Sequence, residues 1–253
     1  MFKELEDAWT QDSKGYDELI QKQFSNRRDV EHWSCELKKI LGNEPLRILD
    51  VGCGPGFLSI ILSRLGHEVK AIDGSVGMAS CAAGNFATEG KDIPVEVEDA
   101  VTLPNEDSES YDVIISRDVV WTLYNPQEAF IRWKEVLKPG GKIVIYDGNY
   151  RRDRHSLKIS LWKGLSAILA VITEKKMPNR KAHHDNQGVF AALPMVICER
   201  PEADMELLRN AGYKKIRVTN DKYRNTPKRL EFWKYGYQGR KFRVIAWKSK
   251  NRI

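Results

Sequence analysis

The chain has 253 residues and a formal net charge of +6; 42% of its residues are hydrophobic and 30% are charged. This is the composition of an ordinary globular protein, and the length predicts one sizeable domain. No run of 18 apolar residues occurs and the first residues are acidic, so neither a membrane-spanning helix nor a signal peptide is expected. The four cysteines lack paired spacing, which favours reduced thiols in a cytoplasmic protein without a disulfide framework or a metal site.

Charge is distributed unevenly along the chain. Residues 1–150 contain 16 Lys/Arg and 26 Asp/Glu, whereas residues 151–253 contain 25 and 9. The basic part predicts either an anionic partner, such as nucleic acid, an acidic small molecule or a membrane surface, or simply a solvated face.

Residues 1–43 have the pattern of helices dotted with aromatic side chains, and Gly42 and Pro45 mark their end. Trp9 and Tyr16 are candidates for covering a substrate, although packing of the rings against other elements is the favoured explanation.

The segment LRILDVGCGPG at residues 46–56 combines a short apolar run with three glycines, and an apolar helical pattern follows it. This order predicts a buried strand, a tight turn and a helix whose free N–H groups face the turn. A dinucleotide-binding loop needs glycine at its first, third and sixth positions. Counted from Gly52, the sixth position is Phe57, so the spacing does not fit a dinucleotide.

Further strands are predicted for EVKAID, for IPVEV and for the stretch from Tyr111 to Ser116, followed by a helix from Pro126. Residues 138–141 predict a sharp turn before a fifth strand that ends near Asp147. The alternation of strands and helices predicts an α/β fold with a doubly wound, mostly parallel sheet. Ligands of such sheets lie outside the carboxyl ends of the strands, where Asp73 suits a ribose and Asp99 an adenine.

Together, ILDVGCGPG, AID, EDAVTLP, YDVIISR and LKPGGKIVIYD follow the order and spacing found in class I S-adenosylmethionine-dependent methyltransferases, and residues 45–148 resemble that family. The resemblance implies a seven-stranded Rossmann-like sheet with helices on both faces, an antiparallel last strand and S-adenosyl-L-methionine as the cofactor. It implies that the cofactor is bound by Asp50, Gly52, Cys53, Gly54, Gly56, Asp73, Gly74, Met78, Asp99, Ala100, Ser116 and Arg117.

Four segments are expected: a helical cap at residues 1–43, the cofactor-binding core at 44–149, an insertion at 150–205, and a last helix with two strands at 206–253. The insertion contains an apolar helical stretch, interpreted as a lid that packs on the core in preference to one that contacts a membrane. The candidate substrate contacts are Trp9, Tyr16, Trp121 and Arg151, and the candidates for a general base are Tyr146, Asp147, His183 and His184.

The leading hypothesis is methyl transfer to an oxygen, nitrogen, carbon or sulfur atom of a small molecule. Two alternatives remain open. The basic segment at residues 223–241, with interleaved aromatic rings, suits stacking on the bases of RNA. A cofactor-binding or interaction protein without catalysis is the other.

Overall fold

The computed structural model describes residues 2–150, 157–174, 187–223 and 225–250. In chain order its helices and strands are α1 (Phe2–Ser25), α2 (Arg27–Leu41), β1 (Arg47–Val51), α3 (Phe57–Arg64), β2 (Glu68–Asp73), α4 (Val76–Thr88), β3 (Val95–Val97), β4 (Tyr111–Arg117), η1 (Val120–Thr122), α5 (Pro126–Val136), β5 (Leu137–Gly148), α6 (Leu157–Glu174), α8 (Gln187–Ala191), α9 (Pro194–Ile197), α10 (Glu202–Asn210), β6 (Lys215–Asn220), α11 (Leu230–Tyr235), η2 (Gly236–Gln238) and β7 (Lys241–Trp247).

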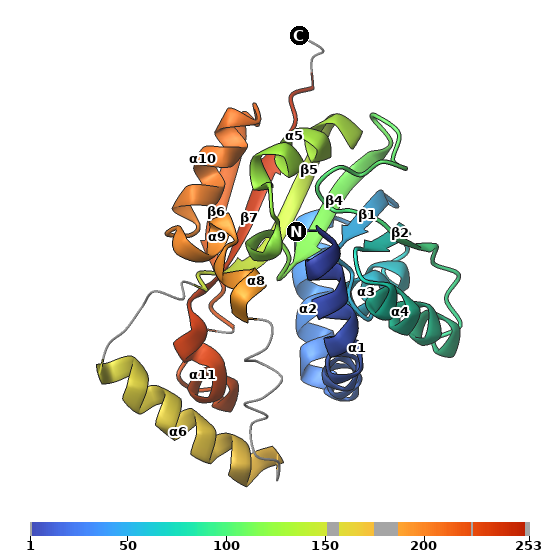
Figure 1. Cartoon of the computed structure of the whole chain (residues 1–253). Helices are drawn as coiled ribbons and strands as arrows, with labels where there is room; N and C mark the ends of the chain where they lie inside the picture. The colour runs from blue at the N-terminus through green and yellow to red at the C-terminus, as the bar shows by residue number, and fades with distance from the viewer. Residues whose placement is uncertain (1, 151–156, 175–186, 224, 251–253) are drawn as a thin grey trace.

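The strands form one seven-stranded sheet in the order β3-β2-β1-β4-β5-β7-β6 (Figure 1). Strands β1 to β5 pair in parallel, while β7 runs antiparallel to both of its neighbours. The predicted fold class is therefore confirmed, including the antiparallel last strand.

Each face of the sheet carries its own apolar core. On one face, side chains of α2, α3 and α4 pack on the strands, with Trp33 and Phe57 among the buried rings. On the other face, α5 and α10 cover the sheet around the fully buried Trp133. The apolar runs of the central strands are continuous because these strands are buried on both sides.

One predicted turn lies inside a strand. Residues 138–141 belong to β5, and the irregularity appears as a register shift in its pairing with β4, between Tyr111 and Val113. Gly140 supplies the left-handed backbone there, with φ of +80°. The signals for a turn and for a β-bulge are the same residues, which explains the error.

Helix α1 lies across α4 beside the carboxyl ends of β1 and β2 (Figure 1). The hydroxyl oxygens of Thr10 and Ser75 are 2.9 Å apart, and Asn85 donates to a carboxylate oxygen of Asp17 at 2.8 Å. Gly77 gives the room for this contact, because a Cβ there would lie 2.7 Å from the Ser13 hydroxyl oxygen.

A buried ion pair ties the chain after the insertion to the sheet. The Arg200 guanidinium donates to Asp204 at 2.6 and 2.9 Å and to Asp147, at the end of β5, at 3.0 Å. All three side chains are fully shielded from solvent.

Helix α6 lies beside α11, away from the sheet (Figure 1). Its apolar stretch is not largely buried: six of its Leu, Ile and Val side chains are exposed. None of the described helices is both long and apolar enough to cross a membrane.

Candidate active site

A cavity of about 2020 Å³ opens at the carboxyl ends of the central strands and continues toward α6 and α11. It brings together most of the residues predicted for the cofactor. Those that line it are Asp50, Gly52, Cys53, Gly54, Asp73, Gly74, Met78, Asp99, Ala100 and Arg117. Gly56 and Ser116 are not in its wall.

The glycine loop has the backbone that only glycine adopts easily. Gly52, Gly54 and Gly56 have φ of +67°, +54° and +89°. A Cβ on Gly52 would lie 2.3 Å from a methyl carbon of Val119, and one on Gly56 would lie 2.3 Å from the Phe86 ring. Gly56 therefore serves the packing of the α3 N-terminus, whereas Gly54 faces the cavity with nothing within 4 Å.

Asp73 joins this loop to the start of α4. One carboxylate oxygen accepts from the Gly54 N–H at 2.8 Å and the other from the Ser75 N–H at 2.9 Å. Ser75 itself caps α4, accepting from the Met78 N–H. Burial raises the pKa of Asp73 to about 6, against the lowering effect of these hydrogen bonds.

Asp50 lies on β1 beneath the same loop and is almost fully buried. Ser59 donates a hydrogen bond of 2.5 Å to its carboxylate. Burial raises the pKa of Asp50 to about 6, and Ser59 and the nearby Arg117 guanidinium partly oppose the shift. The floor of the cavity thus has the buried carboxyl group of Asp50 and the partly buried one of Asp73, which suit a cationic ligand.

Asp99, two residues after the end of β3, also lines the cavity. It accepts from the Val101 N–H at 2.9 Å and from the Tyr124 hydroxyl at 2.6 Å. The adjacent Ala100 carbonyl accepts from the Trp133 indole at 2.7 Å. Tyr124 was not predicted, since no local pattern links it to an acid 25 residues earlier.

The two residues at the end of β4 separate in space. The Arg117 guanidinium lies over the rings of Trp33 and Phe57, 5.4 and 4.9 Å from their centroids. Ser116 is fully buried within the sheet, paired with Val51 and the neighbouring β5. Ser116 does not line the cavity, and its contact with the cofactor stays a prediction.

Aromatic rings line the part of the cavity next to the loop after β4. Trp9 packs edge-on against Tyr16 and Trp121, at centroid distances of 5.4 and 6.1 Å. Phe190 contacts both tryptophans and was not among the residues predicted from the sequence. The rings predicted as substrate contacts thus pack together and also face the cavity.

A polar group next to these rings was also missed. Asp118 has φ of +59°, and its carboxylate accepts from the Tyr150 hydroxyl at 2.5 Å and from Lys241 at 3.0 Å. Burial, together with the charges of Asp118 and Asp12, raises the pKa of Tyr16 to about 12. This hydroxyl therefore stays protonated at neutral pH.

The proposed general bases are not supported by the geometry. Asp147 is enclosed by Arg200, and its carboxylate also accepts from the Trp121 N–H, so it is a structural residue. Tyr146 is buried against the ring of Trp33 and does not line the cavity. Arg151, His183 and His184 lie outside the described residues.

Part of the segment considered for RNA stacking makes contacts within the protein. The Tyr223 ring stacks on His32 at 3.6 Å, and its hydroxyl donates to Asp29. Arg229 lies over the same ring and also donates to Asp29. Tyr223 is therefore engaged with α2, which weakens the case for a base-stacking platform.

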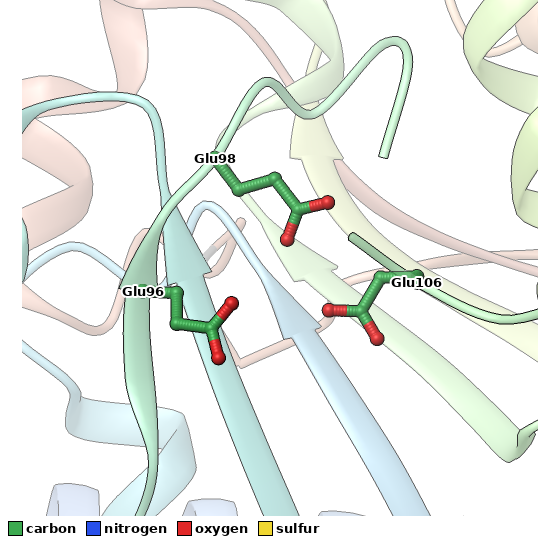
Figure 2. Close-up of side chains that lie close together, drawn as sticks. All are labelled: Glu96, Glu98 and Glu106. Atoms are coloured by element: carbon green, nitrogen blue, oxygen red, sulfur yellow. The ribbon is translucent and has the colours of Figure 1, made fainter. Parts of the chain in front are cut away.

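Three glutamates gather away from the cavity, around the end of β3 (Figure 2). Lys70 lies among them, 2.7 Å from Glu106 and 3.0 Å from Glu96. Glu98 accepts from the Asn105 N–H, and burial with the neighbouring Glu106 raises the pKa of Glu98. Because the ammonium group already supplies positive charge, we assign the cluster a structural role.

A pair of glycine substitutions separates strain from steric contact in the loop. Gly52→Ala and Gly54→Ala should each lower the free energy of unfolding by about 1–2 kcal/mol, the cost of a left-handed non-glycine residue. Gly52→Ala should cost more, because only its Cβ meets Val119. Urea denaturation measures both, and equal losses would contradict the steric argument.

The features that indicate the class of protein are a doubly wound sheet, a glycine loop after β1, and acidic residues at the ends of β1 and β2 and after β3. Residues 49–145 match the family model described as "Methyltransferase domain". This part of the chain is similar to methyltransferase domains, in agreement with the resemblance of residues 45–148.

Similar proteins were found by sequence and by structure. A ubiquinone biosynthesis O-methyltransferase of Caulobacter sp. (strain K31) is 35% identical over 102 residues, which are 40% of this chain and 40% of that protein. The chain thus matches less than half the length of this relative. A Methanococcus maripaludis protein, described as an S-adenosyl-L-methionine-dependent methyltransferase, has a TM-score of 0.62 and 21% identity, over 96% and 95% of the chains.

A third similarity is structural only. Haemonchus contortus phosphoethanolamine N-methyltransferase 2, solved with phosphomonomethylethanolamine and S-adenosylhomocysteine, has a TM-score of 0.60 at 18% identity. The match covers 87% of this chain and 53% of that one. At this identity it supports the fold and says nothing about the substrate of this chain.

Proposed function

We propose that the chain is an S-adenosylmethionine-dependent methyltransferase whose acceptor is a small molecule. The observation that carries the proposal is the single cavity that joins the glycine loop and its buried carboxylates to an aromatic-lined extension. The Caulobacter relative is an O-methyltransferase, which favours an oxygen atom as the acceptor.

The residues present fit the cofactor. Asp50 offers negative charge to its amino group, Asp73 offers acceptor oxygens to its ribose, and Asp99 with Ala100 borders the place for its adenine. Gly54 leaves room for close approach of the ligand, since no atom lies where its Cβ would be. When bound, the cofactor supplies a methyl group already activated on a sulfonium.

The chain's own part in the reaction would be to bind and orient the acceptor. Trp9, Trp121 and Phe190 form the wall against which an apolar or aromatic acceptor would lie. Lys163 also lines the cavity and would favour an acceptor with an anionic group. Holding two reactants aligned can lower a barrier by about 7–11 kcal/mol, so no strong base is required.

The segments would divide the work as follows. Residues 1–43 would cover the cofactor, 44–149 would bind it, and 206–253 would complete the sheet. Within 150–205, α6 would act as part of a lid, because Trp162 and Ser166 line the cavity. The reduced thiols fit the cytoplasmic location proposed for this enzyme.

Two measurements test the proposal in sequence. Calorimetry should show binding of S-adenosylhomocysteine and none of a nicotinamide dinucleotide. Transfer of an isotope-labelled methyl group should then be assayed on a panel of phenols, hydroxy acids and amines, with tRNA beside them. Absence of S-adenosylhomocysteine binding would refute the proposal. Binding without transfer to any acceptor would favour a non-catalytic protein.

Cofactor affinity should depend on pH. The pKa values of Asp50 and Asp73 are raised to about 6, so both groups are mostly ionised above that pH and take up protons below it. Because the cofactor's cationic amino group and ribose hydroxyls favour the ionised forms, S-adenosylhomocysteine affinity should fall by up to about tenfold per pH unit below 6 for each group. Titration calorimetry from pH 5 to 8 measures this, and a constant affinity would contradict it.

A further inference from the structure

Asp118, Tyr150 and Lys241 form a polar group in the wall of the cavity. The Tyr150 hydroxyl donates to Oδ1 of Asp118 at 2.5 Å, and the Lys241 ammonium donates to the same oxygen at 3.0 Å. That ammonium also lies over the Tyr150 ring, 4.1 Å from its centroid. A carboxylate accepts about four hydrogen bonds over its two oxygens, so these two donors do not saturate it.

The chain holds this polar group in a fixed geometry. Asp118 has a left-handed backbone, with φ of +59°, and its N–H donates to the Tyr146 carbonyl at 2.7 Å. Asn225 fixes the other side, because its side chain accepts from the Lys241 N–H at 3.0 Å and donates to the Lys241 carbonyl at 2.7 Å. A non-glycine residue in such a backbone is a local strain that proteins keep mainly at functional sites.

The polar group lies between the glycine loop and the aromatic rings. Val119, the residue after Asp118, packs on the glycine loop, since a Cβ on Gly52 would lie 2.3 Å from its methyl carbon. On the other side, the Trp121 indole donates to the Asp118 carbonyl at 2.9 Å. The Trp121 ring is 5.5 Å from the Tyr150 ring, centroid to centroid. A molecule that lies on these rings and points its reacting atom at the cofactor would therefore pass beside Asp118.

The charges of the polar group indicate which kind of methyl acceptor it suits. The charge of Lys241 balances that of Asp118, so the pair offers no net charge to a fully ionised molecule. A neutral O–H or N–H group can donate to the carboxylate, and such a bond is about twice as strong as one between neutral groups. An atom without a hydrogen would instead turn its lone pairs toward those of the carboxylate.

We propose that Asp118, oriented by Tyr150 and Lys241, binds the hydroxyl or amine group that receives the methyl group. The proposal rests on the proposed function and narrows its oxygen, nitrogen, carbon or sulfur acceptors to those that donate an O–H or N–H hydrogen bond. The methyl acceptor directs its hydrogen at the carboxylate and a lone pair at the methyl group, the alignment that the transfer requires. Asp118 is then the residue that determines specificity, and Tyr150 and Lys241 are positioning residues.

A matched pair of naphthalenes tests the proposal on the full chain, saturated with S-adenosylhomocysteine. 2-Naphthol has an O–H group on an aromatic ring system, and 2-methoxynaphthalene is its methyl ether, which lacks the donor. Calorimetry should show that the unchanged protein binds 2-naphthol at least about tenfold more tightly than the ether, the scale of a hydrogen bond to a charged group. Equal affinities, or no binding of 2-naphthol, would overturn the proposal.

Two variants assign the preference to the polar group. Asp118→Asn tolerates the left-handed backbone. Because Tyr150 and Lys241 are both donors, the amide oxygen takes the place of Oδ1 and the NH₂ group that of the other oxygen. This variant should lose the preference for 2-naphthol and bind the ether at least as well as the unchanged protein does. Tyr150→Phe keeps the ring and removes one donor to Asp118, so it should lower the preference without changing the affinity for the ether.

Asp12→Asn is the matched control, because Asp12 also lines the cavity and its charge also acts on Tyr16. It should keep the preference for 2-naphthol. Loss of the preference in both Asp→Asn variants would assign it to negative charge in general, and a preference retained in Asp118→Asn would remove Asp118 from the site; either result overturns the proposal. S-adenosylhomocysteine binding by each protein reports folding and tests the proposed function separately. A chain that binds it without distinguishing the two naphthalenes would refute the role of Asp118 and leave the proposed function standing.

Discussion

Replacing Arg200 with leucine is expected to lower the free energy of unfolding by about 3–5 kcal/mol, the usual cost of breaking a fully buried ion pair. The substitution leaves the carboxylates of Asp147 and Asp204 without the guanidinium that both contact, in a place with no solvent access. Chemical denaturation measures the loss. Arg209→Leu, at an exposed position of α10, the helix that carries Asp204, is the matched control and should change stability little.

The loss should be larger at pH 8 than at pH 5. Burial raises the pKa of Asp147 to about 6 even with Arg200 present, and without the guanidinium the pKa must rise further. An acid whose pKa is raised on folding destabilises the folded state when ionised, and this cost disappears as pH falls through the folded-state pKa. Adding Asp147→Asn should therefore restore part of the stability at pH 8. A loss independent of pH would show that packing, and not charge, holds Arg200.

Replacing Asp73 with alanine is expected to weaken S-adenosylhomocysteine binding by about 1.5–3 kcal/mol, the scale of hydrogen bonds to a charged group. The carboxylate arranges the loop through Gly54 and Ser75 and would also accept from the ribose. Stability should change less than affinity, because a carboxyl group whose pKa is raised on folding destabilises the folded state when ionised, and its removal offsets part of the loss of the two hydrogen bonds. Calorimetry and thermal unfolding measure the two effects.

Two further variants make this result specific. Asp92→Ala removes a carboxylate that is exposed and distant from the cavity wall, and should leave affinity unchanged. Asp73→Asn removes the charge and keeps one of the two acceptor oxygens, so its affinity should lose the pH dependence that Asp73 contributes. Unchanged affinity in Asp73→Ala would remove Asp73 from the cofactor site.

The sequence by itself determined the sheet and the cofactor half of the site. Apolar runs ended by Asp50, Asp73 and Asp99 locate the strand ends, and carboxyl ends of parallel strands meet at one edge of the sheet. Glycine spacing reports backbone geometry directly, since only glycine adopts a left-handed conformation at no steric cost. These are local signals, and the structure places Asp50, Asp73 and Asp99 around one cavity.

Only the tertiary structure decided the acceptor half of the site and the role of several charges. Asp147 was a candidate general base in the sequence, but in the structure it is bound by Arg200, 53 residues later in the chain. Phe190 packs against Trp9 although 181 positions of the chain separate them. Lys241 donates to Asp118 over a separation of 123 positions. The apolar pattern of α6 was visible in the sequence, but whether an apolar face is buried or exposed depends on which elements pack against it, and no local pattern of residues records that.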